Sequence, residues 1–285
     1  MDSIPFLKLI FGSQPNDLIL STFNNLGNLG RLANQMFQYA SLKGIARNRG
    51  YEFSIPPKNV FGTRDPMVKH DGTTIYDVFG LDEKNQVGLY PHPVMMEKVH
   101  TFDEELFNSC PDSVDLFGYY QTEKYFKHIE DEIRDDFKFD DELRDLCENF
   151  IKENFVYRDV ISLHIRRGDY VHNPNHPSQP IEYYQRALEM LPDLDVIVFS
   201  DDPEWCNQQE LFASDRFAIS EGNTADADLC LMSLCKYHII ANSSFSWWGA
   251  WLAKSDKVIA PKDWFGGDCV NKSIEDVPFG NFVFL

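Results

Sequence analysis

Two adjacent arginines follow an apolar run in the stretch LHIRRGDY, residues 163 to 170. An arginine that leaves a buried strand is costly to desolvate unless an anion pairs with it. Because guanidinium offers a forked set of donors that suits phosphate, Arg166 and Arg167 predict a phosphate or pyrophosphate site. The alternative is a structural ion pair with Asp169 in the turn that follows.

The alternation of a strand assigns these side chains to two faces. His164 and Arg166 share one face of the predicted strand, and Arg167 lies on the other. We expect Arg166 to hold the anion, whereas Arg167, which begins the turn, is better placed to pair with Asp169. His164 is then either a satisfied core residue or a side chain of the same site.

A second segment suited to anions is ANSSFSWWGAWL, residues 241 to 252. Asn242, Ser243, Ser244 and Ser246 stand where an apolar run ends and a helical pattern begins, so hydroxyl groups and free N–H groups could receive an anion there. An ordinary serine N-cap is the alternative. Since the chain has neither a Walker loop nor GxGxxG, the two segments favour a nucleotide diphosphate held without a dinucleotide fingerprint.

Metal chemistry is not favoured by the sequence. Asp226 and Asp228 form a DxD pair, but acidic residues are expected in the first turn of a helix, or one carboxylate contacts a base or ribose. The eight histidines show no HxxxH or HExxH spacing. We therefore expect no metal site and no cofactor. The spacing of the tryptophans after Ser246 predicts helix core rather than a platform for sugar.

The elements that position these residues follow from apolar periodicity. After residue 155, apolar runs alternate with amphipathic stretches, which predicts βαβ units and a mainly parallel sheet. Ligands of such sheets lie beyond the carboxyl ends of the strands, where both segments fall. The preceding part predicts a short strand over 17–23, a helix over 31–49, a strand over 51–55, loops and short elements over 56–100, and an exposed helix or helix pair over 130–155. This pattern indicates an N-terminal domain, 1–155, and a C-terminal domain, 156–285.

Composition excludes several classes of protein. With 285 residues, 43% of them hydrophobic, the chain can bury a sizeable core. The net charge of -19 disfavours nucleic acid and anionic membranes as partners. The six cysteines form no CxxC pair and predict reduced thiols. No signal peptide and no run of about 18 apolar residues is present, so we expect a cytoplasmic protein; the alternative is a membrane anchor outside these residues.

At this point the chain resembles the inverting α1,2-fucosyltransferases that use GDP-fucose. Six stretches carry the resemblance, in family order and over nearly the whole chain: GRLANQMFQYA (30–40), FGYYQTEKYF (117–126), LHIRRGDY (163–170), FSDDPEWC (199–206), DLCLMSLCKYHIIANSSFSWWGAWL (228–252) and APKDWF (260–265). HxRRGD together with NSSFSWWGAWL is the specific signal, whereas more distant fucosyltransferases share GRLANQ.

The resemblance implies a GT-B type α/β glycosyltransferase, with two Rossmann-like domains facing a cleft and no metal. The N-terminal domain would be the acceptor side, and the C-terminal domain would bind GDP-fucose. Roles are implied for seven residues: Arg166 neutralises the β-phosphate, His164 and Asp228 lie near the nucleoside, Ser243, Ser244 and Phe245 form the phosphate-binding turn, and Asn34 reaches the donor from the N-terminal domain. Ala33 departs from the glycine of many relatives, which predicts a less free backbone there.

The implied reaction moves L-fucose from GDP-fucose to a sugar hydroxyl, the 2-hydroxyl of galactose, with inversion. Arg166 and the serine turn would stabilise the GDP leaving group. The base stays open among Asp169, His164 and the departing phosphate. Two alternatives remain: a transferase that uses another nucleotide sugar or a protein acceptor, and a non-catalytic protein that binds a sugar nucleotide or a glycan. The sequence identifies neither the acceptor glycan nor the oligomeric state.

Overall fold

The computed structural model describes residues 20–58, 73–157 and 159–285. The chain forms two compact units, Met1–Lys138 and Phe139–Leu285. Helix α5 (Asp141–Asn154) belongs to the second unit, because Cys147 and Ile151 pack in a cluster with side chains of that unit. The sequence placed the boundary after this helix, and the structure places the division between the units before it.

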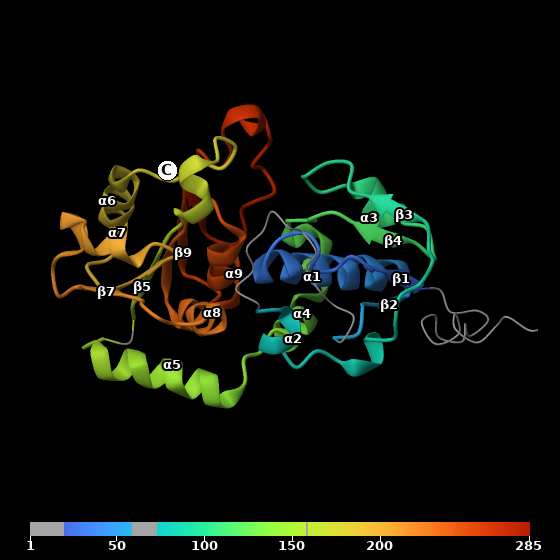
Figure 1. Ribbon diagram of the computed structural model, residues 1–285, viewed down its shortest axis with the longest axis horizontal. Coiled ribbons are helices and arrows are strands. Elements are labelled where there is room, and N and C mark those ends of the chain that lie inside the picture. Colours follow the sequence, from blue (N-terminus) through green and yellow to red (C-terminus); the bar gives the residue numbers. More distant parts are fainter. Residues whose placement is uncertain (1–19, 59–72, 158) are drawn as a thin grey trace, which may run out of the picture. The chain divides into compact units, whose positions relative to one another are not determined.

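The first unit is built on a four-stranded parallel sheet with the order β2-β1-β4-β3 (Figure 1). Its strands and helices are β1 (Leu20–Thr22), α1 (Leu32–Arg49), β2 (Glu52–Ser54), α2 (Ile75–Val78), β3 (Val94–Met96), α3 (Glu104–Ser109), β4 (Asp115–Phe117) and α4 (Glu130–Asp136). The strand expected over 17–23 is thus confirmed over 20–22, and its first residues lie outside the described part of the chain.

Helix α1 is the central element of this unit. It agrees with the prediction of a helix over 31–49, and most of its residues are buried. Gly50 ends the helix with φ 70, a left-handed conformation that glycine adopts without steric cost, and its N–H bonds to carbonyls of the last turn. At the other end, Asn34 and Gln35 donate their N–H groups to the carbonyl of Arg31. The helix therefore presents its first turn just beyond the end of β1.

The second unit contains a six-stranded parallel sheet with the order β10-β9-β8-β5-β6-β7. Figure 1 labels β9, β5 and β7 of this sheet. Its elements after α5 are β5 (Ile161–Ile165), α6 (Ile181–Glu189), β6 (Val196–Ser200), α7 (Pro203–Asn207), β7 (Phe217–Ile219), α8 (Ala225–Leu234), β8 (Tyr237–Ile239), α9 (Ser244–Leu252), β9 (Lys257–Ala260) and β10 (Phe282–Phe284). The parallel sheet expected from the alternating pattern is confirmed.

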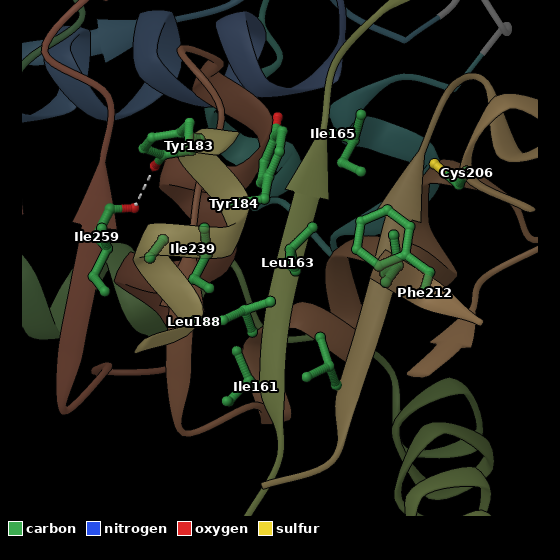
Figure 2. Packing of buried hydrophobic residues seen from close by; sticks show 13 residues of the cluster. Ile161, Leu163, Ile165, Tyr183, Tyr184, Leu188, Cys206, Phe212, Ile239 and Ile259 are labelled. Carbon is green, nitrogen blue, oxygen red and sulfur yellow. Dashed lines mark hydrogen bonds between the residues drawn. The ribbon is translucent and has the colours of Figure 1, made fainter. Parts of the chain in front are cut away.

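The alternation along β5 separates a packing face from a site face. Figure 2 shows Ile161, Leu163 and Ile165 packed with Tyr184 and Leu188 of α6. Each such buried side chain contributes about 1.5–3 kcal/mol of hydrophobic free energy. The intervening Ser162 and His164 lie on the opposite face. This arrangement leaves the other face of β5 for contact with α9.

Two further expectations concern the chain as a whole. All six cysteines are free thiols, five of them buried, as the spacing predicted. Within the described ranges, no helix is both long enough and apolar enough to cross a lipid bilayer.

Candidate active site

The strand order of the second unit creates a switch point between β5 and β8. The chain leaves β5 toward β6 on one side, and it leaves β8 toward β9 on the other side. Ligands of open α/β sheets bind in the crevice beyond the carboxyl ends of two such strands. LHIRRGD follows β5 and NSSF follows β8, so the fold brings the two segments together at this crevice.

A buried hydrogen bond joins the two segments. His164 Nδ1 lies 2.9 Å from Ser246 Oγ, and the imidazole ring is 5.9 Å from the ring of Phe245. Burial, and then the charge of Arg166, lowers the pKa of His164 to about 3. The imidazole is therefore neutral near pH 7. A buried neutral histidine at this edge can offer or accept one hydrogen bond, but it holds a proton poorly.

Arg166 lies between two carboxylates. Its guanidinium pairs with Asp169 and, at 2.8 Å, with Asp201, and it lies 5.3 Å from the ring centroid of Tyr170. The expectation that Arg167 pairs with Asp169 is therefore wrong. The three-residue step from Arg166 to Asp169 runs along a 3-10 turn, Gly168–His172, which returns Asp169 toward Arg166 rather than toward Arg167.

Arg167 has different partners on the other side of the strand. Its Nε donates to Asp202 at 3.0 Å, and its guanidinium lies 4.0 Å from the ring centroid of Trp205 in α7. The backbone N–H of Arg167 also donates to Asp201. A β-carbon at Gly168 would stand 2.3 Å from Asp201 Oδ2, so a larger residue there would displace the Asp201 carboxylate. Arg167 thus fixes the start of the turn to the end of β6.

The arginine pair does not form an excess of positive charge. Two guanidinium groups meet three carboxylates, those of Asp169, Asp201 and Asp202. An anion that binds Arg166 must therefore displace a carboxylate or add to an already paired cation. Asp169 is the candidate for displacement, because 57% of its side chain is exposed, against 25% for Asp201.

The serine segment forms the N-terminus of α9. Ser243 is the N-cap, and its hydroxyl accepts from the N–H of Phe245 at 3.3 Å. Ser244 begins the helix, and the Asn242 carbonyl accepts from the hydroxyl of Tyr170. The capping interpretation is therefore correct, and the helix dipole still points its positive end at the crevice. The tryptophans that follow are buried, as expected.

A loop wall lies next to these residues. His176 packs between the rings of Tyr170 and Phe265, at centroid distances of 5.5 and 5.9 Å. Asn175 binds the loop after β9, because its carbonyl accepts from Gly266 and its Oδ1 from Asp268. A shallow pocket of about 420 Å³ opens here, lined by Arg167, Tyr170 and residues of the segment 171–178. The wall therefore holds Tyr170 beside Arg166.

Asp228 lies further along the same edge, beyond β7. Its Oδ1 accepts from Ser220 at 2.6 Å and from Asn223 at 3.3 Å, and burial raises its pKa. Asp226 shares the first turn of α8 with it. The part of the chain that the structure describes contains no group of three or more histidine, cysteine or acidic side chains that could hold a metal ion.

In the first unit, Asn34 stands in the first turn of α1. Its Oδ1 accepts from Gln121 Nε2 at 2.6 Å. Gly30 precedes the helix with φ +81, and a β-carbon there would lie 1.9 Å from Asn34 Nδ2. Ala33 lies inside the helix and is buried. Alanine has the highest helix propensity, so Ala33 in place of the glycine of many relatives does not destabilise the helix.

Asp201, Asp202 and Gln121 were not among the expected site residues. The two aspartates stand directly after the apolar run of β6. Their position at the carboxyl end of a strand could have indicated that they belong to the site. Gln121 follows β4, a strand of three residues that the pattern did not mark.

Comparison with known proteins adds the family. Residues 91–277 match the model of glycosyl transferase family 11. The α-1,2-colitosyltransferase of Escherichia coli is 33% identical over 270 residues, which cover 85% of this chain and 92% of that protein. Galactoside α-(1,2)-fucosyltransferase 2 of Bos taurus is 25% identical over 270 residues, which cover 88% of this chain and 72% of that protein.

The fold also has a relative among solved structures. A crystal structure of NodZ α-1,6-fucosyltransferase soaked with GDP-fucose matches with a TM-score of 0.56 at 14% identity, over 88% of this chain and 97% of that one. This likeness confirms the expected GT-B type α/β fold with two parallel sheets. The family match and the identity to the bacterial relative go further: the chain belongs to glycosyl transferase family 11, the α1,2-fucosyltransferase family that its motifs resemble.

Proposed function

We propose that the protein transfers L-fucose from GDP-fucose to the 2-hydroxyl of a terminal galactose, with inversion at the anomeric carbon. One observation carries this proposal: Arg166 stands at the switch point opposite the N-terminus of α9. A guanidinium and a helix N-terminus together suit a diphosphate. The names of the relatives support fucose as the sugar and galactose as the acceptor.

Charge on the leaving group is the main demand of this reaction. As the bond between fucose and GDP breaks, negative charge grows on the β-phosphate, and donors fixed in advance stabilise it. Arg166 supplies the cation once the phosphate displaces Asp169, while Asp201 keeps the guanidinium in place. Ser243, Ser244 and Phe245 supply the hydroxyl and N–H donors of the turn. His164 and Asp228 are then the residues of the same edge that contact the nucleoside.

The acceptor hydroxyl attacks the face of fucose opposite GDP and must lose a proton. Burial lowers the pKa of His164 to about 3, which argues against His164 as the base. Asp169 is released from Arg166 when the phosphate binds, so it is the better protein candidate. The departing phosphate is the other acceptor for this proton. Loss of the solvent-isotope effect in Asp169→Ala would favour Asp169.

For the first unit, we propose that Asn34 has a role in binding the donor, as the motif around it implies. A neutral carboxamide adds a hydrogen-bond donor to the donor sugar nucleotide without adding charge. In this proposal the unit with Asn34 is the acceptor side, and the unit with Arg166 binds GDP-fucose. The domain roles assigned to 1–155 and 156–285 thus carry over, with α5 on the nucleotide side.

A second donor sugar has a specific observation in its favour. The colitosyltransferase is 33% identical, whereas the bovine galactoside fucosyltransferase is 25% identical. Colitose is fucose without its 3-hydroxyl. A site that binds this hydroxyl discriminates strongly against the deoxy sugar, but a site without such a contact discriminates weakly. GDP-fucose and its 3-deoxy analogue should therefore be compared at equal concentration.

The test is release of GDP and formation of product with each donor and a panel of oligosaccharides that end in galactose or in another sugar. We expect turnover with galactose-terminated acceptors, and nuclear magnetic resonance of the product should show an α1,2 linkage. Binding of GDP-fucose without turnover on any glycan would favour a non-catalytic sugar-nucleotide binding protein. Turnover with a peptide alone would favour a protein acceptor.

Metal-independent turnover is part of the proposal, because Arg166 and the N-terminus of α9 provide the charge stabilisation that a metal would otherwise supply. Turnover should be the same with and without EDTA. Activity that disappears with EDTA and returns with manganese would make Asp226 and Asp228 metal ligands.

Cytoplasmic localisation follows from the same proposal, since the relatives with the higher identity are bacterial and GDP-sugars are made inside the cell. Fractionation of cells that express the chain should place the activity in the soluble fraction. Activity in the membrane fraction that resists high salt would contradict this.

A further inference from the structure

Asn242 lies between β8 and α9, one residue before the N-cap Ser243, and only 2% of it is exposed. Three hydrogen bonds hold it. Its Nδ2 donates to the carbonyl of Trp264 at 3.0 Å, its Oδ1 accepts from Nε2 of Gln179 at 3.4 Å, and its carbonyl accepts from the hydroxyl of Tyr170 at 3.2 Å. We call Asn242 and these three partners the Asn242 junction.

The partners of Asn242 come from two other loops at the carboxyl edge of the sheet. Tyr170 and Gln179 belong to the segment between β5 and α6, and Trp264 follows β9. Gln179 is 8% exposed, and its Nε2 also reaches the carbonyl of Asp263 at 3.1 Å. The junction therefore joins the loops that follow three adjacent strands, β5, β8 and β9.

Helix capping does not account for this junction. Ser243 caps α9, because its hydroxyl accepts from the N–H of Phe245. Among the described residues, the side chain of Asn242 bonds to no N–H group of the helix, and both of its bonds run to other loops. A cap needs only the first of these contacts. The bonds of Asn242 instead fix where the first turn of α9 lies relative to the neighbouring strands.

One link of the junction leads directly to Arg166. The ring of Tyr170, whose hydroxyl holds Asn242, lies 5.3 Å from the guanidinium of Arg166. The junction thus connects the two groups that suit a diphosphate, the arginine and the N-terminus of α9. Donors stabilise an anion best when they are fixed in position beforehand, because they then need no reorganisation. A shift of the first turn of α9 would therefore weaken binding of the phosphates first.

We propose that Asn242 is a positioning residue: it holds the first turn of α9 against the turn that carries Arg166, so that a bound diphosphate meets both at one fixed spacing. This role rests on the proposed function, which assigns the phosphates of GDP-fucose to this edge. Asn242 does not itself contact the substrate, because its side chain is buried and both of its polar atoms bond within the protein.

Asn242→Ser tests this role. Serine is too short to reach Trp264 and Gln179, so the start of α9 loses two of its three bonds to other loops. We expect the affinity for GDP to fall about tenfold or more, as for the loss of one hydrogen bond to a charged group. The affinity for guanosine, which has the same nucleoside and no phosphate, should stay unchanged. Calorimetric titration with GDP and ligand-observed nuclear magnetic resonance with guanosine measure the two affinities.

Gln179→Met is a milder variant that leaves Asn242 in place. Methionine is as long and flexible as glutamine and fills the same space, but it cannot donate to Oδ1 of Asn242. The affinity for GDP should fall about threefold, a smaller loss because the bond from Gln179 is long. The affinity for guanosine should again stay unchanged. This variant decides the question if Asn242→Ser does not fold.

Ser255→Ala is the matched control for stability. The hydroxyl of Ser255 lies 3.2 and 3.0 Å from the carbonyls of Lys236 and Lys257, at the amino ends of β8 and β9. Its loss should lower the melting temperature and leave both affinities unchanged. Equal losses for GDP and guanosine in Asn242→Ser, or a selective loss for GDP in Ser255→Ala as well, would make Asn242 structural and overturn the proposal.

The unchanged protein separates a failure of this role from a failure of the proposed function. If it binds GDP no better than guanosine, the phosphate site fails, and the proposed function fails with it. If it prefers GDP, and the folded variants Asn242→Ser and Gln179→Met keep the same ratio of affinities, only the positioning role of Asn242 fails.

Discussion

The two units use opposite chemistry at the ends of their strands. Beyond β5 and β6, the second unit gathers two guanidinium groups and three carboxylates, with a neutral buried imidazole behind them. Beyond β1 and β4, the first unit gathers uncharged amides, Asn34 and Gln121, around a glycine turn. The ionic region suits the charge of a diphosphate, and the amide region suits the neutral oxygens of sugars.

This difference also separates two ways to fix a side chain. Arg166 is fixed by ion pairs, one of which must open for an anion to bind. Asn34 is held by a hydrogen bond from Gln121, and its side chain lies against Gly30, where a β-carbon would leave no room. Neither feature has to change when a ligand binds. We therefore expect the ionic region to respond to charge and pH, and the amide region to respond to shape.

Arg166→Lys should have the largest effect. Lysine keeps the charge but cannot pair with Asp201 and a phosphate through one planar fork, so we expect kcat to fall about 100-fold or more. Arg167→Lys is the control, because Arg167 binds Asp202 and packs on Trp205 and should act through stability. Turnover and thermal melting of both variants check this. A fully active Arg166→Lys beside a folded but inactive Arg167→Lys would reverse the assignment.

Gly30→Ala should break the amide region by shape alone. The left-handed conformation costs an L-residue about 1–2 kcal/mol, and the β-carbon also meets Asn34. Gly50→Ala has φ +70 and no atom within 4 Å of the added carbon, so it isolates the cost of conformation. Both variants should melt lower, and only Gly30→Ala should lose about tenfold or more in kcat, an estimate from the loss of one donor. Equal activities would show that the Gly30 contact does not serve Asn34.

Acid should weaken the second unit through His164. Burial lowers its pKa to about 3, below the value of about 6.5 in the unfolded chain. Below about pH 6.5, His164 binds a proton in the unfolded chain but stays neutral in the folded unit. The stability contribution is thus present above pH 6.5 and is lost as pH falls, by up to about 1.4 kcal/mol per pH unit.

Urea unfolding of the protein and of His164→Asn between pH 7 and pH 5 measures this slope. The free energy of unfolding of His164→Asn should fall less steeply with acid than that of the unchanged protein. The difference in slope should correspond to at most one bound proton. His238, whose pKa burial lowers to about 4, keeps its own contribution in both proteins. Burial raises the pKa of Asp228, which acts in the opposite direction and is also common to both. Identical slopes would mean that His164 is protonated in the folded unit.

Asp169→Asn should have the smallest effect. Unlike the other substitutions, it should strengthen ligand binding. Removing the carboxylate that competes for Arg166 should tighten GDP binding by a few fold, as expected for one partly exposed pair of about 0.2–1 kcal/mol. Asp193→Asn removes a carboxylate that pairs with Arg216 elsewhere in the unit and should leave GDP affinity unchanged. Calorimetric titration of both with GDP decides, and weaker binding by Asp169→Asn would mean that Asp169 stays on Arg166 in the complex.

The sequence predicted the parts of this comparison that depend on local pattern. The parallel sheet of the second unit, the placement of LHIRRGD and NSSF at its carboxyl edge, and helix α1 were confirmed. The spacing of apolar residues and the residues that end helices and strands are local features, so they can be recognised in the sequence without a structure. The segment 130–155 also forms a helix pair, as its apolar positions indicated.

The partners of the polar side chains could not be predicted in the same way. Arg166 meets Asp201 because β5 pairs with β6 in the register that sets Ile165 opposite Ser200. Asn34 meets Gln121 because β1 pairs with β4, a strand of three residues. Register between strands far apart in the chain depends on packing and turn geometry, which the local pattern does not contain.

The aromatic side chains give the two units different optical properties. All five tryptophans of the chain lie in the second unit: Trp205, Trp247, Trp248, Trp251 and Trp264. Trp205 lies under the guanidinium of Arg167, and three others pack in α9, whose N-cap is Ser243. Tryptophan emission therefore reports on the second unit alone, and a spectral change on adding GDP assigns the event to that half of the chain without any label.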